Sequence, residues 1–256
     1  MVDPVSTVAL TGAALATGRK VLGPTIDQFA KDLAAVYSAW RAENFARILQ
    51  RVSRRSEPMP DGEAVHPRVA HEVLDAGSWI NDDVQQEYLA GLLLTSRSPG
   101  GADDSGTYYA GIASRMTAAQ TRLHFLIYAS LEGTATGDQN PISIAFNEAK
   151  ELCVITETSE LEKASGVTGQ AVVEALDALW RAGLIGQWGT GRVTPDRPEP
   201  MSWAEPTSIG ARLYLRARGI KDVFVDMVRS SELKYEPFDP EPERLTSATL
   251  GLPPVN

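Results

Sequence analysis

Hydrophobic residues recur with the period of a helix over a long stretch near the start of the chain. Between residues 25 and 54 most of them stand three or four positions apart, which places them on one face of a helix. They are Ile26, Phe29, Leu33, Val36, Tyr37, Trp40, Ile48 and Val52. A Gly-Pro pair, which interrupts helices, precedes this stretch at residues 23 and 24. The pattern predicts one amphipathic helix over about 25–54.

Shorter helices are predicted from there to residue 155. Segments rich in polar residues, glycine or proline separate them, and we expect a linker over 56–66 and flexible loops over 97–106 and 133–141. The first expected helix runs from Pro67 to about 76, and the second begins after a cap at Ser78 or Asn81. A third follows the loop over 97–106 and ends at about 115, a fourth begins after a cap at Thr117, and a fifth covers 142–155.

The pattern changes after residue 155. A short helix over 159–164 and a turn at Gly166 precede a second helix, which Thr168 caps and Gly183 ends. A strand over 184–188, a proline-rich excursion over 189–206 and a closing helix from Thr207 follow. This order of elements is typical of a winged helix-turn-helix.

These patterns together predict a mainly α fold with three parts. A helical N-terminal domain covers residues 1–155, and a winged helix-turn-helix-like module with a small β-hairpin covers 156–219. Residues 220–256 hold a short helix to about 229 and an acidic tail with several prolines, which we expect to be partly disordered.

Charge is unevenly distributed along the 256 residues. The chain has 24 Lys and Arg against 33 Asp and Glu, a formal net charge of −9, yet residues 1–56 hold eight basic and only four acidic side chains. Arg51, Arg54 and Arg55 lie at the C-terminal end of the long helix, where they suit its dipole. They are candidate interaction residues, and the alternative is a solvated helix face.

Within residues 5–22, the longest apolar stretch covers 5–17, which is too short to cross a bilayer because a crossing takes about 20 apolar residues. Asp3 stands where a secretory signal carries positive charge. The segment is therefore interpreted as a packed first helix, or as one that makes peripheral contact with a membrane surface or a partner groove. The single cysteine excludes a disulfide framework and fits a cytoplasmic location.

No motif in the sequence indicates catalysis, a cofactor or a metal. The glycines before Arg19 and Lys20 lack the spacing of a phosphate loop. His66 and His71 are five residues apart, which favours surface or capping roles over metal ligation. Asp82, Asp83 and Glu87 could form an acidic pair, but the start of a helix explains them more simply.

The winged-helix pattern raises the question of DNA binding. Its second helix, over 168–182, carries Glu174 and Asp177 against a single Arg181. A helix that enters the major groove normally offers basic or amide side chains to phosphates and bases. The sequence therefore favours protein contact or self-association over nucleic acid, although Arg192 and Arg197 in the wing keep DNA binding open.

Several segments are similar to one family. They are 23–28 (GPTIDQ), 44–49 (NFARIL), 65–69 (VHPRV), 87–93 (EYLAGLL), the helix after Met116 and Thr117, and 207–213 (TSIGARL). Together they resemble the abortive infection alpha (Abi-alpha) family, whose function is unknown but which is associated with bacterial resistance to phage. The resemblance spans most of residues 20–220, and the loops over 97–106 and 189–206 depart from it.

The resemblance, together with the missing catalytic motifs, leads to the hypothesis of a non-enzymatic bacterial protein that acts through protein contacts, with membrane association as a further expected feature. It supplies no catalytic residues that could be assigned in this chain. The alternative is a transcriptional regulator that uses the winged helix on DNA. A hydrolase with an unrecognised site is a third hypothesis.

Overall fold

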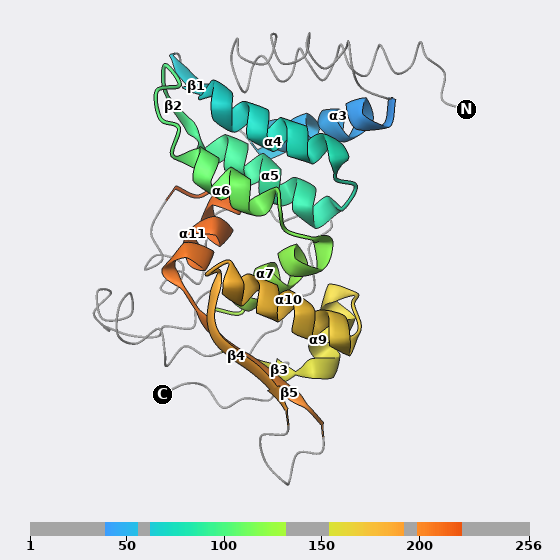
Figure 1. The fold of residues 1–256 in the computed structure, drawn as a ribbon. Helices are drawn as coiled ribbons and strands as arrows, with labels where there is room; N and C mark the ends of the chain where they lie inside the picture. Colours follow the sequence, from blue (N-terminus) through green and yellow to red (C-terminus); the bar gives the residue numbers. More distant parts are fainter. Residues whose placement is uncertain (1–38, 56–61, 132–153, 192–198, 222–256) are drawn as a thin grey trace. The chain divides into compact units, whose positions relative to one another are not determined.

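The computed structural model describes residues 39–55, 62–131, 154–191 and 199–221. The described chain is mainly helical with a small antiparallel sheet, as the sequence predicted (Figure 1). It divides into two compact units. The first contains the described residues up to Arg115 together with Arg216–Lys221, and the second contains those of Met116–Leu215. We expected α7 (Ala118–Ala129) in the N-terminal domain, and it lies in the second unit.

The first unit is a group of packed helices with one small hairpin. Its helices are α3 (Ala39–Arg55), α4 (Pro67–Trp79), α5 (Asp83–Thr95) and α6 (Gly106–Ala113). Helix α3 packs against α4 and α5, and α6 packs against the same two helices. Apolar side chains from α3, α4 and α5, such as Ile48, Leu74 and Leu92, are fully buried there. The described half of the predicted 25–54 helix is thus helical, and residues 25–38 lie outside the described residues.

Two helix starts in this unit test the predicted caps. Pro67 begins α4 as predicted, and His66 caps it by accepting a hydrogen bond from the backbone N–H of Arg68. Helix α5 begins after Asp82, whose carboxylate accepts from the N–H of Gln85 at 3.0 Å. The predicted cap at Ser78 or Asn81 is wrong, because the Ser78 hydroxyl bonds within α4 and Asn81 accepts from Arg47.

The predicted linker and loop on either side of α4 and α5 contain two short strands. Strand β1 (Glu63–Val65) pairs antiparallel with β2 (Arg97–Pro99), so that Val65 stands opposite Arg97. Gly100 and Gly101 follow β2 with φ of 60° and 66°, and the N–H of Gly100 donates to Gly62. Glycine adopts this left-handed backbone without strain. Three-residue strands are too short to display an alternating pattern.

The second unit combines three helices with a three-stranded sheet. Its elements are α7, β3 (Val154–Glu157), α9 (Thr158–Ser165), α10 (Gly169–Arg181), β4 (Ile185–Gly191), β5 (Met201–Pro206) and the start of α11 (Ser208–Ala217). The antiparallel sheet has the order β3-β5-β4, and α7, α9 and α10 pack against one another. Thr117 begins α7 with a reciprocal capping box to Gln120, which confirms the predicted cap.

Two predictions for this unit are wrong. The excursion expected over 189–206 contains the end of β4 and all of β5, whose residues alternate only weakly in burial. Residues 154 and 155, which were expected at the end of a helix over 142–155, lie in strand β3, where Val154 pairs with Ala204. Residues 142–153, and those from 222 on, where a short helix and an acidic tail were expected, lie outside the described residues.

Tyr128 links the helices of the second unit to its sheet. Its hydroxyl donates to the carbonyl of Leu184 at 2.5 Å and accepts from the N–H of Thr207 at 2.9 Å. Its ring is fully buried and stacks on Tyr214. Burial raises the pKa of Tyr128 to about 12, so that the hydroxyl keeps its proton for this donation at physiological pH.

Candidate functional site

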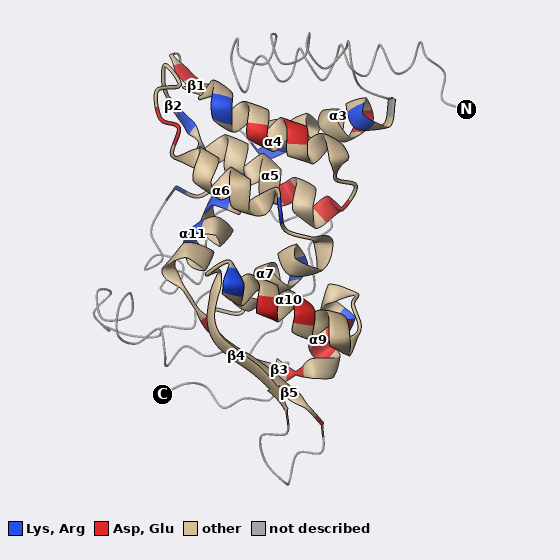
Figure 2. Cartoon of the chain, viewed as in Figure 1, with Lys and Arg blue, Asp and Glu red and all other residues tan. Residues whose placement is uncertain are grey.

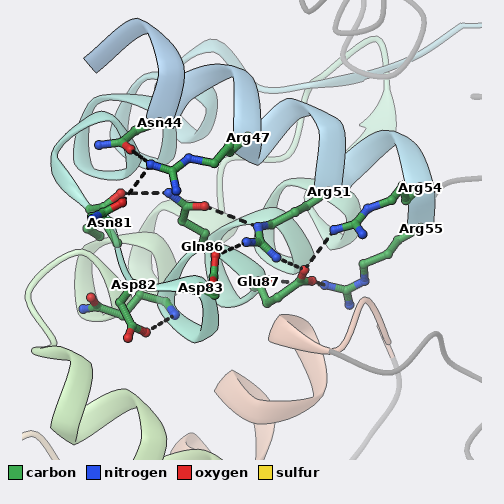
Figure 3. Close-up of polar contacts among 12 residues, drawn as sticks. Asn44, Arg47, Arg51, Arg54, Arg55, Asn81, Asp82, Asp83, Gln86 and Glu87 are labelled. Carbon is green, nitrogen blue, oxygen red and sulfur yellow. Dashed lines mark hydrogen bonds and ion pairs between the residues drawn. The ribbon is translucent and has the colours of Figure 1, made fainter. Parts of the chain in front are cut away.

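The three arginines that the sequence marked as candidate interaction residues meet on one carboxylate (Figure 3). Arg51, Arg54 and Arg55 lie on the last turns of α3 and point toward Glu87 on α5. We call these four residues, with Asp83 and Gln86 of α5, the Glu87 cluster. Its members come from two helices that are adjacent in space and separated by about 30 residues in the sequence.

Hydrogen bonds in the Glu87 cluster use both carboxylate oxygens of Glu87. Arg51 Nη1 donates to Oε1 at 2.5 Å, and Arg55 Nη1 donates to Oε2 at 3.2 Å. Arg54 Nη2 lies 3.6 Å from Oε1. Arg51 also bonds to Asp83 and Gln86, and Arg55 Nη2 donates to the carbonyl of Ala217 at 3.0 Å. The cluster therefore joins α3 both to α5 and to the C-terminal residues of the first unit.

Burial explains why this cluster needs several partners. Glu87 is 1% exposed, and the side chains of Arg51 and Arg55 are nearly as buried. A buried charge is tolerated only when it is paired and hydrogen-bonded. Burial lowers the pKa of Arg55, and the charge of Glu87 opposes that change. These groups stabilise the packing of the helices, whereas Arg54, with 49% of its side chain exposed, also faces solvent.

A second polar network serves the other half of α3. Arg41 donates to Asp75 at 2.9 Å and to the Ser78 hydroxyl at 2.7 Å, both on α4. Asn44 donates to the carbonyl of Ser78, and Arg47 donates to Asn81 at 2.8 Å. The basic excess of residues 1–56 is therefore partly used inside the first unit, on the contacts of α3 with α4 and α5.

The sequence did not identify Glu87 as the partner of these arginines. We interpreted Asp82, Asp83 and Glu87 as charges at a helix start, which is right for Asp82 and fits Asp83 in the first turn. Glu87 lies one turn further along. A signal was present, because Arg51 and Arg55 are four residues apart, as are Asp83 and Glu87, so each pair shares a helix face. Nothing in the sequence told us that α3 and α5 are neighbours.

The exposed surface of α10 is the second candidate. We call Gln170, Glu174, Asp177, Trp180 and Arg181 the α10 face. Trp180 is 48% exposed, and Arg181 donates to Asp177 at 2.7 Å. Gln170 Nε2 donates to Glu174 at 3.1 Å, so one of its amide hydrogens is already engaged. Figure 2 shows acidic positions along α10 and a basic one at its end.

An aromatic pair lies exposed on the first unit. The rings of Trp40 on α3 and Trp79 at the end of α4 have centroids 6.3 Å apart. They are 42% and 59% exposed, and the Arg41 guanidinium lies 3.6 Å from the centroid of the Trp79 ring. Neither tryptophan was singled out from the sequence as an exposed residue, because Trp40 fits the apolar stripe of the long helix.

Other candidate chemistry is placed as follows. His66 has the predicted capping role. Within the described ranges, no three His, Cys, Asp or Glu side chains are grouped so that they could hold a metal ion. Across the same ranges, no helix has the length and apolar character needed to span a membrane. Arg192 and Arg197 lie outside the described residues.

Comparisons with family models, curated proteins and solved structures find no match to this chain. The resemblance to the abortive infection alpha family therefore depends on the sequence segments alone and stays a prediction.

Proposed function

We propose that this chain is a non-enzymatic bacterial protein of the abortive-infection type, which acts in the cytoplasm through contacts with other proteins or with a second copy of itself. We also propose that residues 1–22 make peripheral contact with a membrane. The α10 face carries the first of these proposals. It combines a half-exposed tryptophan with an acidic surface. Tryptophan is enriched among the residues that dominate binding at protein interfaces. Surfaces that bind the phosphates of nucleic acid carry basic side chains instead.

We further propose that the described residues from β3 to β5 form a winged helix. The sheet order β3-β5-β4 supports this, because it is the order produced when a strand, two helices and a hairpin follow one another in that fold. The packing of α7, α9 and α10 against one another supports it as well. In this arrangement α10 is the helix that a DNA-binding protein would place in the major groove.

The charges of α10 support a protein partner over DNA. Glu174 is exposed, and the only basic side chain of the helix, Arg181, is already bonded to Asp177. Near DNA, the carboxylates of Glu174 and Asp177 would face phosphates of the same charge sign. A protein partner with basic and apolar groups would instead meet opposite charge together with the Trp180 ring.

A phage-protection assay in a bacterial host tests the proposal. We expect the wild-type chain to lower the efficiency of plating, and the Trp180→Ala and Glu174→Lys changes to restore plaques. Tyr108→Ala, which alters a 55% exposed aromatic residue of the first unit, is the matched control and should keep protection. Circular dichroism should show that every variant is folded.

Two results would contradict this function. One is a wild-type chain that gives no protection. The other is full protection by Trp180→Ala and Glu174→Lys together, which would show that the α10 face is not used. Removal of residues 1–22 tests the proposed peripheral membrane contact in the same assay, and unchanged protection would count against that contact.

The alternative function is transcriptional regulation through DNA, and the winged-helix element order favours it. Arg192 and Arg197 would then contact phosphates from the wing. Duplex binding should be salt-dependent and should weaken when both arginines become alanine. The absence of a gel shift at low salt would dismiss this alternative.

A further inference from the structure

Two pairs of side chains on the outer surface of α10 repeat at the same spacing. Val173 and Trp180 are seven residues apart, and so are Glu174 and Arg181. Seven residues make nearly two turns of an α-helix, so each pair forms a line along α10. Val173 is partly exposed, and the other three side chains are exposed. The surface therefore presents an apolar line and a charged line, with Asp177 between them.

The two ends of each line differ in character. In the charged line, the acidic Glu174 comes first and the basic Arg181 ends the helix. Figure 2 shows this basic position at the end of α10 and the acidic positions before it. In the apolar line, the small Val173 comes first and the large Trp180 second. Each line is therefore complementary to itself when it is reversed.

A two-fold axis produces this reversal. When two copies of a helix lie antiparallel about an axis perpendicular to both, each line faces the same line of the other copy in the opposite direction. Glu174 then lies opposite Arg181 of the second copy, and Val173 lies opposite Trp180 of the second copy. The centres of the two lines differ by one residue, about 1.5 Å along the helix, so one axis serves both lines. Each contact occurs twice.

The charges of α10 favour this occupant over others. Arg181 donates to Asp177 at 2.7 Å, yet its side chain is 70% exposed, and a guanidinium has five N–H donors. It can therefore also bind Glu174 of a second copy. The two Asp177 side chains would lie near the axis, where their bonds to Arg181 offset their repulsion.

Other surfaces fit the α10 face less well. A nucleic acid or an anionic bilayer would bring negative charge against Glu174, and the interior of a bilayer would remove both Glu174 and Arg181 from water without a partner. A second copy supplies a base for the acid, an acid for the base and an apolar group for each apolar one.

We propose that a second copy of this chain binds the α10 face, with the two α10 helices antiparallel about a two-fold axis. The inference rests on the use of the α10 face given under the proposed function, and it names the partner of that face. Helix α10 has 13 residues and is about 20 Å long, so the contact is small and the dimer should be weak. High salt should weaken it further, because the charged line is exposed.

Charge reversal tests the pairing in the full chain. Sedimentation equilibrium of the wild type should give a mass that rises with concentration from 27.6 kDa toward twice that value. Glu174→Arg and Arg181→Glu should each weaken the dimer by more than about tenfold, because each places like charges in contact twice. The double variant Glu174→Arg/Arg181→Glu should restore the dimer. An equimolar mixture of the two single variants should form a mixed dimer.

Glu43→Arg is the matched control. Glu43 is exposed on α3 of the first unit, and the change of charge is the same as in Glu174→Arg. This variant should dimerise like the wild type. Trp180→Ala should weaken the dimer through the apolar line. Circular dichroism should show that each variant is folded.

Several results would overturn the pairing. A wild type that is monomeric at every concentration, or a dimer that neither single variant weakens, removes the second copy from the α10 face. A folded double variant that stays monomeric, or single variants that do not combine, would show that Glu174 and Arg181 do not meet. A dimer that Glu43→Arg weakens as much as Glu174→Arg would place the contact elsewhere.

This pairing and the proposed function fail separately. If the chain is monomeric but Glu174→Lys abolishes phage protection, a different protein binds the α10 face, so the function stands and the pairing is wrong. If charge reversal acts as described but the wild type gives no protection, the pairing stands and the abortive-infection function is wrong.

Discussion

Glu87 is a residue whose environment could be assigned only from the structure. Its carboxylate receives the side chains of Arg51 and Arg55 in a buried position between α3 and α5. Breaking a buried ion pair by removing one partner costs about 3–5 kcal/mol, because the other charge remains buried without compensation. Exposed pairs contribute about 0–1 kcal/mol.

Glu87→Gln is therefore expected to lower the free energy of unfolding by about 3–5 kcal/mol. The change preserves the shape of the side chain but leaves two buried guanidinium groups facing a neutral amide. Denaturant unfolding followed by circular dichroism measures the effect.

Asp83→Asn is the matched control. Asp83 contacts Arg51 from the same helix, but its side chain is 44% exposed, so a loss below about 1 kcal/mol is expected. Equal losses in the two variants would contradict the argument that burial sets the strength of this cluster.

His124 makes the second unit sensitive to acid. The ring is fully buried on α7, and burial lowers its pKa from 6.5 to about 3, although a backbone hydrogen bond to Gly210 opposes this. Below pH 6.5 the unfolded chain binds a proton at this residue and the folded chain does not. Stability is thus intact above pH 6.5 and falls as the pH drops toward 3, by up to about 1.4 kcal/mol per pH unit.

His124→Gln removes the imidazole that binds this proton in the unfolded chain, and it should flatten the decline of stability between pH 6 and pH 4. Denaturant midpoints measured across this range give the slope. A slope unchanged by His124→Gln would show that other groups cause the acid sensitivity.

At the scale of elements, helices were predicted better than strands. Helices α4, α7 and α10 are 12 or 13 residues long, so the helical spacing of their apolar residues is repeated several times. Helix α4 begins at the predicted Pro67, and α7 begins after the predicted cap at Thr117. Strands β1 and β2 have three residues each, and their pairing depends on a partner about 34 residues away. Local pattern contains no information on such partners, which is also why Glu87 was not matched to its arginines.

The start of α11 offers a test of close packing between elements. A Cβ added at Gly210 would lie 2.0 Å from the carbonyl oxygen of Leu184 and 2.1 Å from the Tyr128 hydroxyl. The backbone and a buried, hydrogen-bonded phenol cannot move easily. Gly210→Ala should therefore destabilise the chain by about 1–3 kcal/mol in thermal or denaturant unfolding.

Gly111→Ala is the matched change in a helix with open space. Nothing lies within 4 Å of a Cβ at Gly111 in α6, and alanine there should stabilise by about 0.5–1 kcal/mol through helix propensity. Opposite signs for the two glycines are the expected result. Stabilisation by Gly210→Ala would contradict the packing of α11 against Tyr128.

For the whole molecule, the basic excess of residues 1–56 is not equivalent to a positive surface. Arg41 and Arg51 are buried, Arg55 is paired with Glu87, and Arg47 bonds to Asn81. Only Arg54 of the Glu87 cluster combines a basic charge with substantial exposure. Attraction to an anionic surface must therefore come mainly from other basic residues, and Arg19 and Lys20 next to the apolar segment are the foremost candidates.

Arg19→Gln/Lys20→Gln should weaken binding to vesicles that contain phosphatidylglycerol by about 2 kcal/mol, or roughly thirtyfold, since each basic residue near an anionic bilayer contributes about 1 kcal/mol. The loss should shrink as salt rises and should vanish on pure phosphatidylcholine. Arg54→Gln is the control and should bind like the wild type, because its charge already faces Glu87. An equal loss in Arg54→Gln would mean that the Glu87 cluster faces the membrane, which its burial in the first unit argues against.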